Sequence, residues 1–330
     1  MGGYDFGNRS QPVAWAWCWL ASITFVVSLY LVPARLRSLP RSDPSHQIKA
    51  RLVAVSCTTG VTVLATCLLA RPVDEGLPVR LWIGLGAEGL GAALVLPLLL
   101  VCCLFLGPLA TMAWMSHKLA RHEVTPYGQC RLRTHPLPWH VTARAELVNK
   151  ANLTAGTYSA VRNLVVGPIA EEVVYRGCSV AVLLGAGVSA TKIIWLSPLL
   201  FGFAHLHHAL EWLRQGHSMP TVAAGVLFQI AYTSIFGAFA VFVQLRTGHL
   251  VSSIVVHVMC NYMGVPDVTF SIAPGNSRES TRTSVLFEHR KGLWCLYGVG
   301  IFLFVGLLRP LLSPSLYGSV PWTSAGLSHS

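Results

Sequence analysis

The sequence predicts an all-α, polytopic integral membrane protein with about eight transmembrane helices. Of its 330 residues, 53% are hydrophobic and only 11% are charged, and the mean hydropathy is +0.56. Soluble domains carry a charged share of about 25%, so this composition excludes an ordinary soluble fold. Apolar stretches that can cross a hydrocarbon core of ~30 Å, which takes about 20 residues of helix, recur along the whole chain.

Eight apolar stretches are predicted as membrane helices, with an uncertainty of one. In chain order they cover residues 13–32, 52–70, 81–115, 160–184, 193–210, 221–245, 248–266 and 292–312. The first begins after a polar segment and is followed by Arg35 and Arg37, which is typical of a stop-transfer anchor rather than a cleaved signal. The third is too long for one straight span and contains Pro97 and Pro108, so a kinked helix or a re-entrant pair is expected.

The net charge of +11 predicts the orientation of the chain. Lys and Arg number five in residues 33–51 and six in 116–158, but only two in 71–80. Because cytoplasmic loops of membrane proteins carry the excess of Lys and Arg, the heavily basic loops are expected in the cytosol and both termini on the opposite face. The basic balance is explained in this way, and no nucleic acid is expected as a partner.

Two adjacent carboxylates, Glu171 and Glu172, stand inside the fourth apolar stretch. A charge at the centre of a bilayer costs about 3 kcal/mol or more, so such residues usually mark a pathway or a site. On a helix, Glu172 and Arg176 share a face, whereas Glu171 points about 100° away. We therefore expect Arg176 to neutralise Glu172 and Glu171 to face a cavity as a general base. The alternative is a charge network that only ties helices together. Glu88, in the third stretch, is explained equally well as a partner of the site residues and as a hydrogen-bond donor between helices when protonated.

Two later stretches contribute two imidazoles and an amide. His205 lies inside residues 193–210, and His257 and Asn261 lie four residues apart in 248–266, so they point the same way. A membrane helix rarely carries two such groups without partners. Taken alone, His257 and Asn261 are explained equally well by a hydrogen bond between helices.

Taken together, these side chains supply what peptide hydrolysis requires. A carboxylate and an imidazole can take a proton from water, while a second imidazole and an amide can donate hydrogen bonds to a developing oxyanion. The combination, drawn from three separate helices, is more specific than any member. The sequence therefore predicts an intramembrane hydrolase whose helices surround a catalytic cavity.

Other designs of intramembrane hydrolase fit the sequence less well. The only His-Glu dipeptide, His122-Glu123, does not begin an HExxH zinc helix, no span interior contains Asp, and no GxSxG motif occurs. A zinc site remains chemically possible, with the ligands Glu171, Glu172, His205 and His257. Because Arg176 already supplies positive charge beside the carboxylates, neither a metal nor a cofactor is expected.

The motifs resemble those of the CAAX prenyl endopeptidases of the second type, the Ras-converting enzymes, within the wider family of CAAX proteases and bacteriocin-processing proteins. That family is marked by EExxxR, FxxxH and HxxxN motifs on separate membrane helices. Here the motifs are Glu171-Glu172-Val173-Val174-Tyr175-Arg176, Phe201-Gly202-Phe203-Ala204-His205 and His257-Val258-Met259-Cys260-Asn261. The close match covers roughly residues 163–266.

The resemblance implies a glutamate intramembrane protease of the endoplasmic reticulum membrane, with an active site accessible from the cytosol. It would remove the C-terminal aaX tripeptide from farnesylated or geranylgeranylated CAAX proteins, such as Ras-family small GTPases. By resemblance, Glu171 and His205 would activate the water, His257 and Asn261 would form the oxyanion hole, and Glu172 and Arg176 would position the helix and the substrate's carboxylate. Membrane lipid is the other expected partner, and no oligomeric state is predicted.

A single membrane domain is expected over residues 1–330, with the catalytic core at about 160–266 and a flexible tail at 313–330. Three other functions fit part of the pattern. A transporter or proton channel can also use Glu and His at the midplane, but it predicts repeated helix groups, and no repeat is visible. A non-catalytic scaffold would tolerate loss of motif residues, and none is missing. A relative that cleaves other peptides remains a third possibility.

Overall fold

The computed structural model describes residues 3–5, 10–31, 45–73, 78–124, 130–132, 157–266 and 287–318. These residues are predominantly helical, which confirms the predicted fold class, and the strands among them form two short antiparallel pairs. Most of the predicted cytoplasmic loop 116–158 and residues 319–330 of the predicted tail lie outside the described residues. Within the described part of that tail, Pro314–Leu316 form a 3-10 turn, η4, and Tyr317 is buried.

Contacts between Cα atoms divide the chain into two compact units. The first comprises residues 1–97, 161–258 and 312–330, and the second comprises 98–160 and 259–311. Three of the four boundaries fall within helices: after Pro97 in α5 (Leu90–Leu104), after Ala160 in α8 (Thr157–Val161) and after Val258 in α14 (Leu250–Met263).

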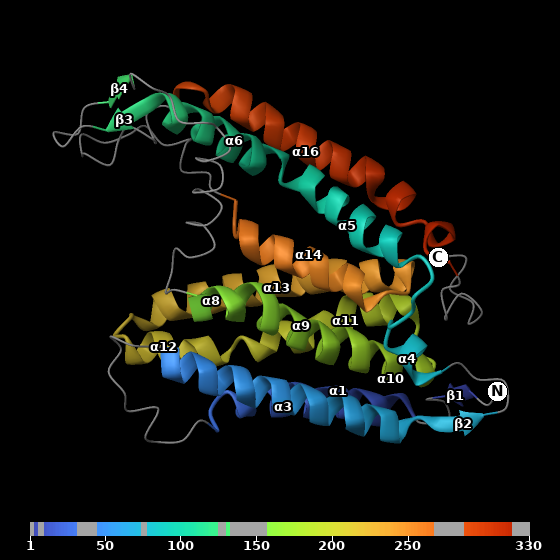
Figure 1. The fold of residues 1–330 in the computed structure, drawn as a ribbon. Coiled ribbons are helices and arrows are strands. Elements are labelled where there is room, and N and C mark those ends of the chain that lie inside the picture. Colours follow the sequence, from blue (N-terminus) through green and yellow to red (C-terminus); the bar gives the residue numbers. More distant parts are fainter. Residues whose placement is uncertain are drawn as a thin grey trace. The chain divides into compact units, whose positions relative to one another are not determined.

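The first unit contains most of the helices. Its elements are β1 (Gly3–Asp5), α1 (Gln11–Ser28), α3 (Ser45–Leu69), β2 (Arg71–Val73), α4 (Val79–Trp82), the start of α5, η1 (Arg162–Val166), α9 (Gly167–Glu172), η2 (Val173–Cys178), α10 (Ser179–Gly185), α11 (Ala190–Ala204), α12 (His207–Arg214), α13 (Met219–Thr247), most of α14, and η4. In Figure 1, α1 and α3 lie side by side against the α9–α10 segment, and that segment faces α11 and α13. The α9–α10 segment is thus enclosed by neighbouring helices.

Three threonine side chains of α3 form hydrogen bonds within that helix. The hydroxyls of Thr58, Thr62 and Thr66 donate to the carbonyl oxygens four residues earlier, at 2.9, 2.9 and 2.8 Å. A hydroxyl that bonds back in this way presents little unpaired polarity to lipid or to a neighbouring helix. These threonines are therefore compatible with an apolar span.

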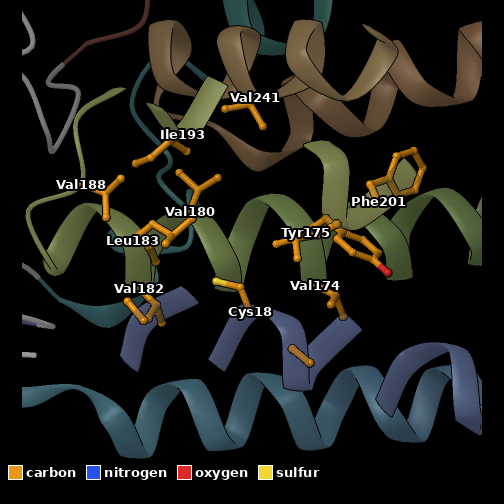
Figure 2. Close-up of a cluster of buried hydrophobic side chains, with 14 of the residues drawn as sticks. Cys18, Val174, Tyr175, Val180, Val182, Leu183, Val188, Ile193, Phe201 and Val241 are labelled. Carbon is orange, nitrogen blue, oxygen red and sulfur yellow. The ribbon is translucent and has the colours of Figure 1, made fainter. Parts of the chain in front are cut away.

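A hydrophobic core joins α1 to the α9–α10 segment and to α11. Figure 2 shows Cys18 of α1 below Val180 and between Val182 and Val174, with the side chains of Tyr175 and Phe201 close together. The two ring centroids are 5.2 Å apart in an edge-to-face arrangement. Because Tyr175 and Phe201 belong to the first and second motifs, the core fixes the distance between the helices that carry those motifs.

The second unit is built on the pairing of α6 (Leu106–Arg121) with α16 (Arg290–Leu311). It also contains α8 (Thr157–Val161, whose last residue belongs to the first unit), β3 (His122–Val124) and β4 (Cys130–Leu132). Glycines allow α16 to approach both α6 and the end of α5 closely. A Cβ at Gly107 of α6 would overlap the ring of Tyr297 on α16, and one at Gly300 of α16 would lie 2.6 Å from the carbonyl oxygen of Cys103 in α5. Small residues at such contacts are typical of helix pairs in membranes.

Helix occurs in each of the eight predicted stretches, but the count of eight spans is not confirmed. Within the described residues, four helical segments are long and apolar enough to cross a membrane: His46–Leu69, Ala190–Arg214, Met219–Thr247 and Arg290–Leu311. A fifth span is possible where Leu90–Leu104 and Leu106–Trp114 meet at an angle of 77°. The long third stretch is therefore bent, as expected, and the break falls at Phe105 rather than at Pro97 or Pro108.

The close contact at Gly300 predicts a loss of stability on substitution. Gly300→Ala is expected to destabilise the chain by about 1–3 kcal/mol, because the carbonyl of Cys103 belongs to the backbone and cannot turn aside. Gly298→Ala is the matched control, since it adds a methyl to the same helix where nothing lies within 4 Å. The measurement is the thermal unfolding midpoint of each detergent-solubilised variant. Equal midpoints for the two variants would contradict the described packing of α16 on the end of α5.

Candidate active site

The two adjacent glutamates lie at the end of a short α-helical segment between two π-helical ones. The α9 segment is preceded by η1 and followed by η2. In η2 the wider turn is visible at Ser179, whose backbone N–H and hydroxyl both bond to the carbonyl of Val174, five residues earlier. Single π-helical turns within α-helices occur frequently at functional sites.

The two glutamate side chains lie in different surroundings. Glu172 is completely buried, whereas the side chain of Glu171 is 26% exposed. The Arg176 guanidinium, itself 1% exposed, donates from Nη1 to Oε1 of Glu172 at 2.9 Å. The predicted pairing of Glu172 with Arg176 is therefore confirmed, and so is the divergence of Glu171 from that pair.

His257 on α14 lies between the two glutamates. Its Nδ1 lies 2.7 Å from Oε1 of Glu172, the oxygen that also accepts from Arg176, and its Nε2 lies 3.6 Å from Oε2 of Glu171. The first contact is a hydrogen bond. The second is too long for one, although ionisable groups at this distance interact electrostatically. One buried carboxylate oxygen therefore links the first motif to the third.

Two aromatic rings enclose the charged groups. The Arg176 Cζ lies 4.5 Å from the ring centroid of Phe201 and 5.7 Å from that of Phe236 on α13. The same rings flank His257, with centroid distances of 6.1 Å to Phe201 and 4.8 Å to Phe236. The faces of aromatic rings attract a guanidinium, so this enclosure favours the buried cation as well as excluding water from it.

His205 is held by the first residue of its own motif. It follows the last residue of α11, and its Nδ1 lies 2.8 Å from the carbonyl oxygen of Phe201. A carbonyl only accepts, so Nδ1 donates and the Nε2 of the neutral ring is an acceptor. Among the described residues, Glu171 forms its polar contact with His257 and not with His205. Whether Glu171 and His205 approach the same water remains a prediction.

The remaining predicted site residue is Asn261, which lies four residues after His257 in α14. It falls beyond Val258, where the second unit begins. Its role in an oxyanion hole remains a prediction. Glu88 is exposed in the turn before α5, beside Gly318, and no role at the site is assigned to it.

Further residues of the site were not identified from the sequence. Gln244 on α13 is fully buried and donates from Nε2 to the backbone carbonyl of Arg176 at 3.1 Å. The sequence does contain a signal for Gln244, because it is a polar residue within the apolar stretch 221–245. The hydroxyl of Tyr175 pairs with that of Ser22 on α1 at 3.0 Å. Phe236 is apolar and belongs to none of the three motifs, so no sequence signal marked it.

The carboxylates and imidazoles of the site are also potential metal ligands. No three His, Cys, Asp or Glu side chains in the described part of the chain converge in a geometry that could hold a metal ion. Glu172 is instead committed to Arg176 and His257 through one oxygen. The four residues considered as zinc ligands do not fit that role in this arrangement.

Comparison with known proteins extends the similarity over most of the chain. The family described as Type II CAAX prenyl endopeptidase Rce1-like matches residues 154–263. The chain is 31% identical to CAAX prenyl protease 2 of Homo sapiens, with 92% of this chain and 84% of the relative covered. It is 30% identical to CAAX prenyl protease 2 of Arabidopsis thaliana, with 95% and 94% covered. No solved structure matches the chain.

The buried pair predicts a characteristic pattern of stability. Arg176→Gln is expected to destabilise the chain by about 3–5 kcal/mol, because it leaves the fully buried Glu172 without its cation. The double variant Glu172→Gln with Arg176→Gln removes both charges and should be less destabilised than Arg176→Gln alone. Thermal unfolding followed by tryptophan fluorescence is the measurement. A double variant less stable than Arg176→Gln would show that Glu172 does not depend on the arginine.

Proposed function

The chain belongs to the family of type II CAAX prenyl endopeptidases, and on this premise we propose that Glu171 is the general base with which it hydrolyses a peptide bond. The protein is a protease and hence a hydrolase, and its apolar helices are those of a multi-pass membrane protein. Its substrates are prenylated CAAX proteins. The residues that act on these substrates are the subject of the proposal.

The observation that carries the proposal is the contrast between the two glutamates. Glu172 is buried and already bonded to Arg176 and His257, so it has no access to water. Glu171 is partly exposed, and its carboxylate lies 3.6 Å from His257 without a close hydrogen bond. A general base needs both access to the reacting water and an oxygen that can accept its proton. Only Glu171 of the pair meets both requirements.

We further assign His205 to the activation of the same water. Its Nδ1 is occupied by the carbonyl of Phe201, which leaves Nε2 as an acceptor. In the proposed step, Glu171 removes a proton from the water as the oxygen attacks the scissile carbonyl carbon, and that proton then passes to the nitrogen of the leaving peptide. Hydrogen bonds at a catalytic base are often long without substrate, so closer contact is expected when substrate is bound.

His257 and Asn261 are proposed to stabilise the oxyanion that forms on the carbonyl oxygen. Because Nδ1 of His257 donates to Glu172, Nε2 can donate to the oxyanion only when the ring carries a second proton. Glu171 and Glu172 lie on either side of the ring and Arg176 balances one of them, so a positive His257 makes the group neutral as a whole. The amide of Asn261, one helical turn further along α14, would supply a second donor.

Glu172 and Arg176 are proposed to position these groups rather than to contact substrate. Arg176 is enclosed by Glu172 and by the rings of Phe201 and Phe236. This enclosure argues for a role in holding α9 and His257 in place. It argues against the other predicted role, a direct contact with the substrate's terminal carboxylate, because a carboxylate would have to displace a ring to reach the guanidinium.

The proposed substrates are farnesylated or geranylgeranylated CAAX proteins, including Ras-family small GTPases, from which the aaX tripeptide is removed. The proposed location is the endoplasmic reticulum membrane, as the family resemblance implies. The site is proposed to be accessible from the cytosol, the side on which the distribution of Lys and Arg places the basic loops. The C-terminal tail would enter from the cytosol. The prenyl chain, for which each CH₂ removed from water contributes about 0.8 kcal/mol, would stay among the helices or in lipid.

Cleavage of a farnesylated CAAX peptide by membranes containing the chain tests the proposal. Glu171→Gln is expected to lower kcat by about 10²–10⁴-fold, and His205→Ala by a similar factor, because each removes a group that handles the water's proton. Glu211→Gln is the matched control, since it makes the same substitution at an exposed position on α12 and should leave kcat unchanged. Full activity of Glu171→Gln would refute its role as the base.

The same assay with a strong chelator separates this mechanism from a zinc peptidase. Unchanged wild-type activity is expected, since the proposed steps use only side chains and water. Loss of activity on chelation that zinc restores would instead assign the catalysis to a metal.

A further inference from the structure

The Arg176 guanidinium depends on space that α13 leaves for it. A Cβ added to Gly237 would lie 3.2 Å from Nη2 of Arg176, closer than nearly all real contacts of that kind. The glycine therefore allows the guanidinium to lie against the backbone of α13. Nη2, the nitrogen on that side, is buried and forms no hydrogen bond of its own in the described residues, so its position is set by packing.

The opposite side of the same contact is rigid. The added Cβ would also lie 2.8 Å from Cβ of Pro198, a residue within α11. The Pro198 side chain is closed onto the backbone and cannot rotate away. A methyl group at position 237 therefore has to move either the guanidinium or one of the two helices, and both α11 and α13 carry rings that enclose Arg176.

The residue before this glycine touches two of the charged groups. The ring of Phe236 lies 5.7 Å from the Arg176 Cζ and 4.8 Å from the imidazole of His257, measured from its centroid. Arg176 and His257 both bond to the same oxygen of Glu172. Phe236 therefore packs against both donors and limits how far either can move from that oxygen.

We propose that Gly237 and Phe236 on α13 are positioning residues of the peptidase, which hold Arg176 and His257 on Glu172 and thereby set the distance from His257 to Glu171. The inference rests on the proposed function of Glu171 and His257 and adds a fourth helix segment to the three motifs. It gives α13 a role in catalysis although no side chain of α13 has to touch the substrate. Displacement of reacting groups by about 1 Å can cost 10²-fold in rate, so a smaller shift of Arg176 should remain measurable.

The first test compares methyl groups at two glycines of α13. Gly237→Ala is expected to lower kcat for a farnesylated CAAX peptide about tenfold with little change in KM, because the site is displaced and the substrate surface is not. Gly225→Ala is the matched control, since its Cβ would press on the ring of Trp212 and not on Arg176; it should retain kcat within about twofold. Equal kcat values for the two variants would overturn the inference.

A second variant separates an effect on Arg176 from an effect on helix packing. Pro198→Gly removes the Cβ of α11 that the methyl group of Gly237→Ala would meet. The contact between that methyl group and Arg176 remains. If Gly237 acts through Arg176, Gly237→Ala should cause the same loss of kcat in the Pro198→Gly background. Recovery of the double variant to the level of Pro198→Gly alone would assign the loss to packing and overturn the inference.

Phe236 is tested by keeping or removing its ring. Phe236→Leu is expected to lower kcat about tenfold, whereas Phe236→Tyr retains a ring beside Arg176 and His257 and should stay within about threefold of wild type. An equal loss of kcat in Phe236→Leu and Phe236→Tyr, or no loss in either variant, would contradict the positioning role of Phe236. Failure of the proposed function can be distinguished from failure of this inference. If the proposed function is wrong, Glu171→Gln retains its activity, whatever the kcat of the α13 variants.

Discussion

One carboxylate oxygen, Oε1 of Glu172, accepts hydrogen bonds from both Arg176 and His257, and the arrangement of the site depends on it. Glu172 is fully buried, and an isolated charge in such a place would be strongly destabilising. Its two donors come from η2 and α14, and the rings of Phe201 and Phe236 bring α11 and α13 against them. The need to compensate the buried charge of Glu172 thus fixes η2, α11, α13 and α14 around Glu171.

Helix geometry explains how neighbouring glutamates can serve different purposes. Both glutamates lie in α9, between η1 and η2, and adjacent residues of a helix point about 100° apart. Glu172 then points inward to Arg176, and Glu171 remains partly exposed. A wide turn leaves backbone carbonyls in need of donors, and at Arg176 the side chain of Gln244 supplies one. A buried amide from α13 thereby satisfies a backbone carbonyl of η2.

Much of the site could be predicted from spacing within a helix. The i, i+4 separation of Glu172 and Arg176 was sufficient to pair them, and the same rule placed Glu171 elsewhere. Contacts between helices were not predictable in this way, because spacing along one helix does not show which neighbour it meets. Three contacts between helices could not be predicted for this reason: the approach of His257 to both glutamates, the packing of Phe236, and the close contact of Arg176 with Gly237. Likewise, the helix bends at Phe105, between Pro97 and Pro108, although the two prolines were the expected positions of a kink.

The central claim is that Glu172 maintains the structure while Glu171 performs the chemistry. Its most direct test is the thermal unfolding midpoint of Glu171→Gln and Glu172→Gln, measured side by side in detergent. The contrast in burial and bonding predicts that Glu172→Gln unfolds at a clearly lower temperature, whereas Glu171→Gln unfolds at the wild-type temperature. Equal losses of stability, or a larger loss for Glu171→Gln, would contradict the division between the two glutamates.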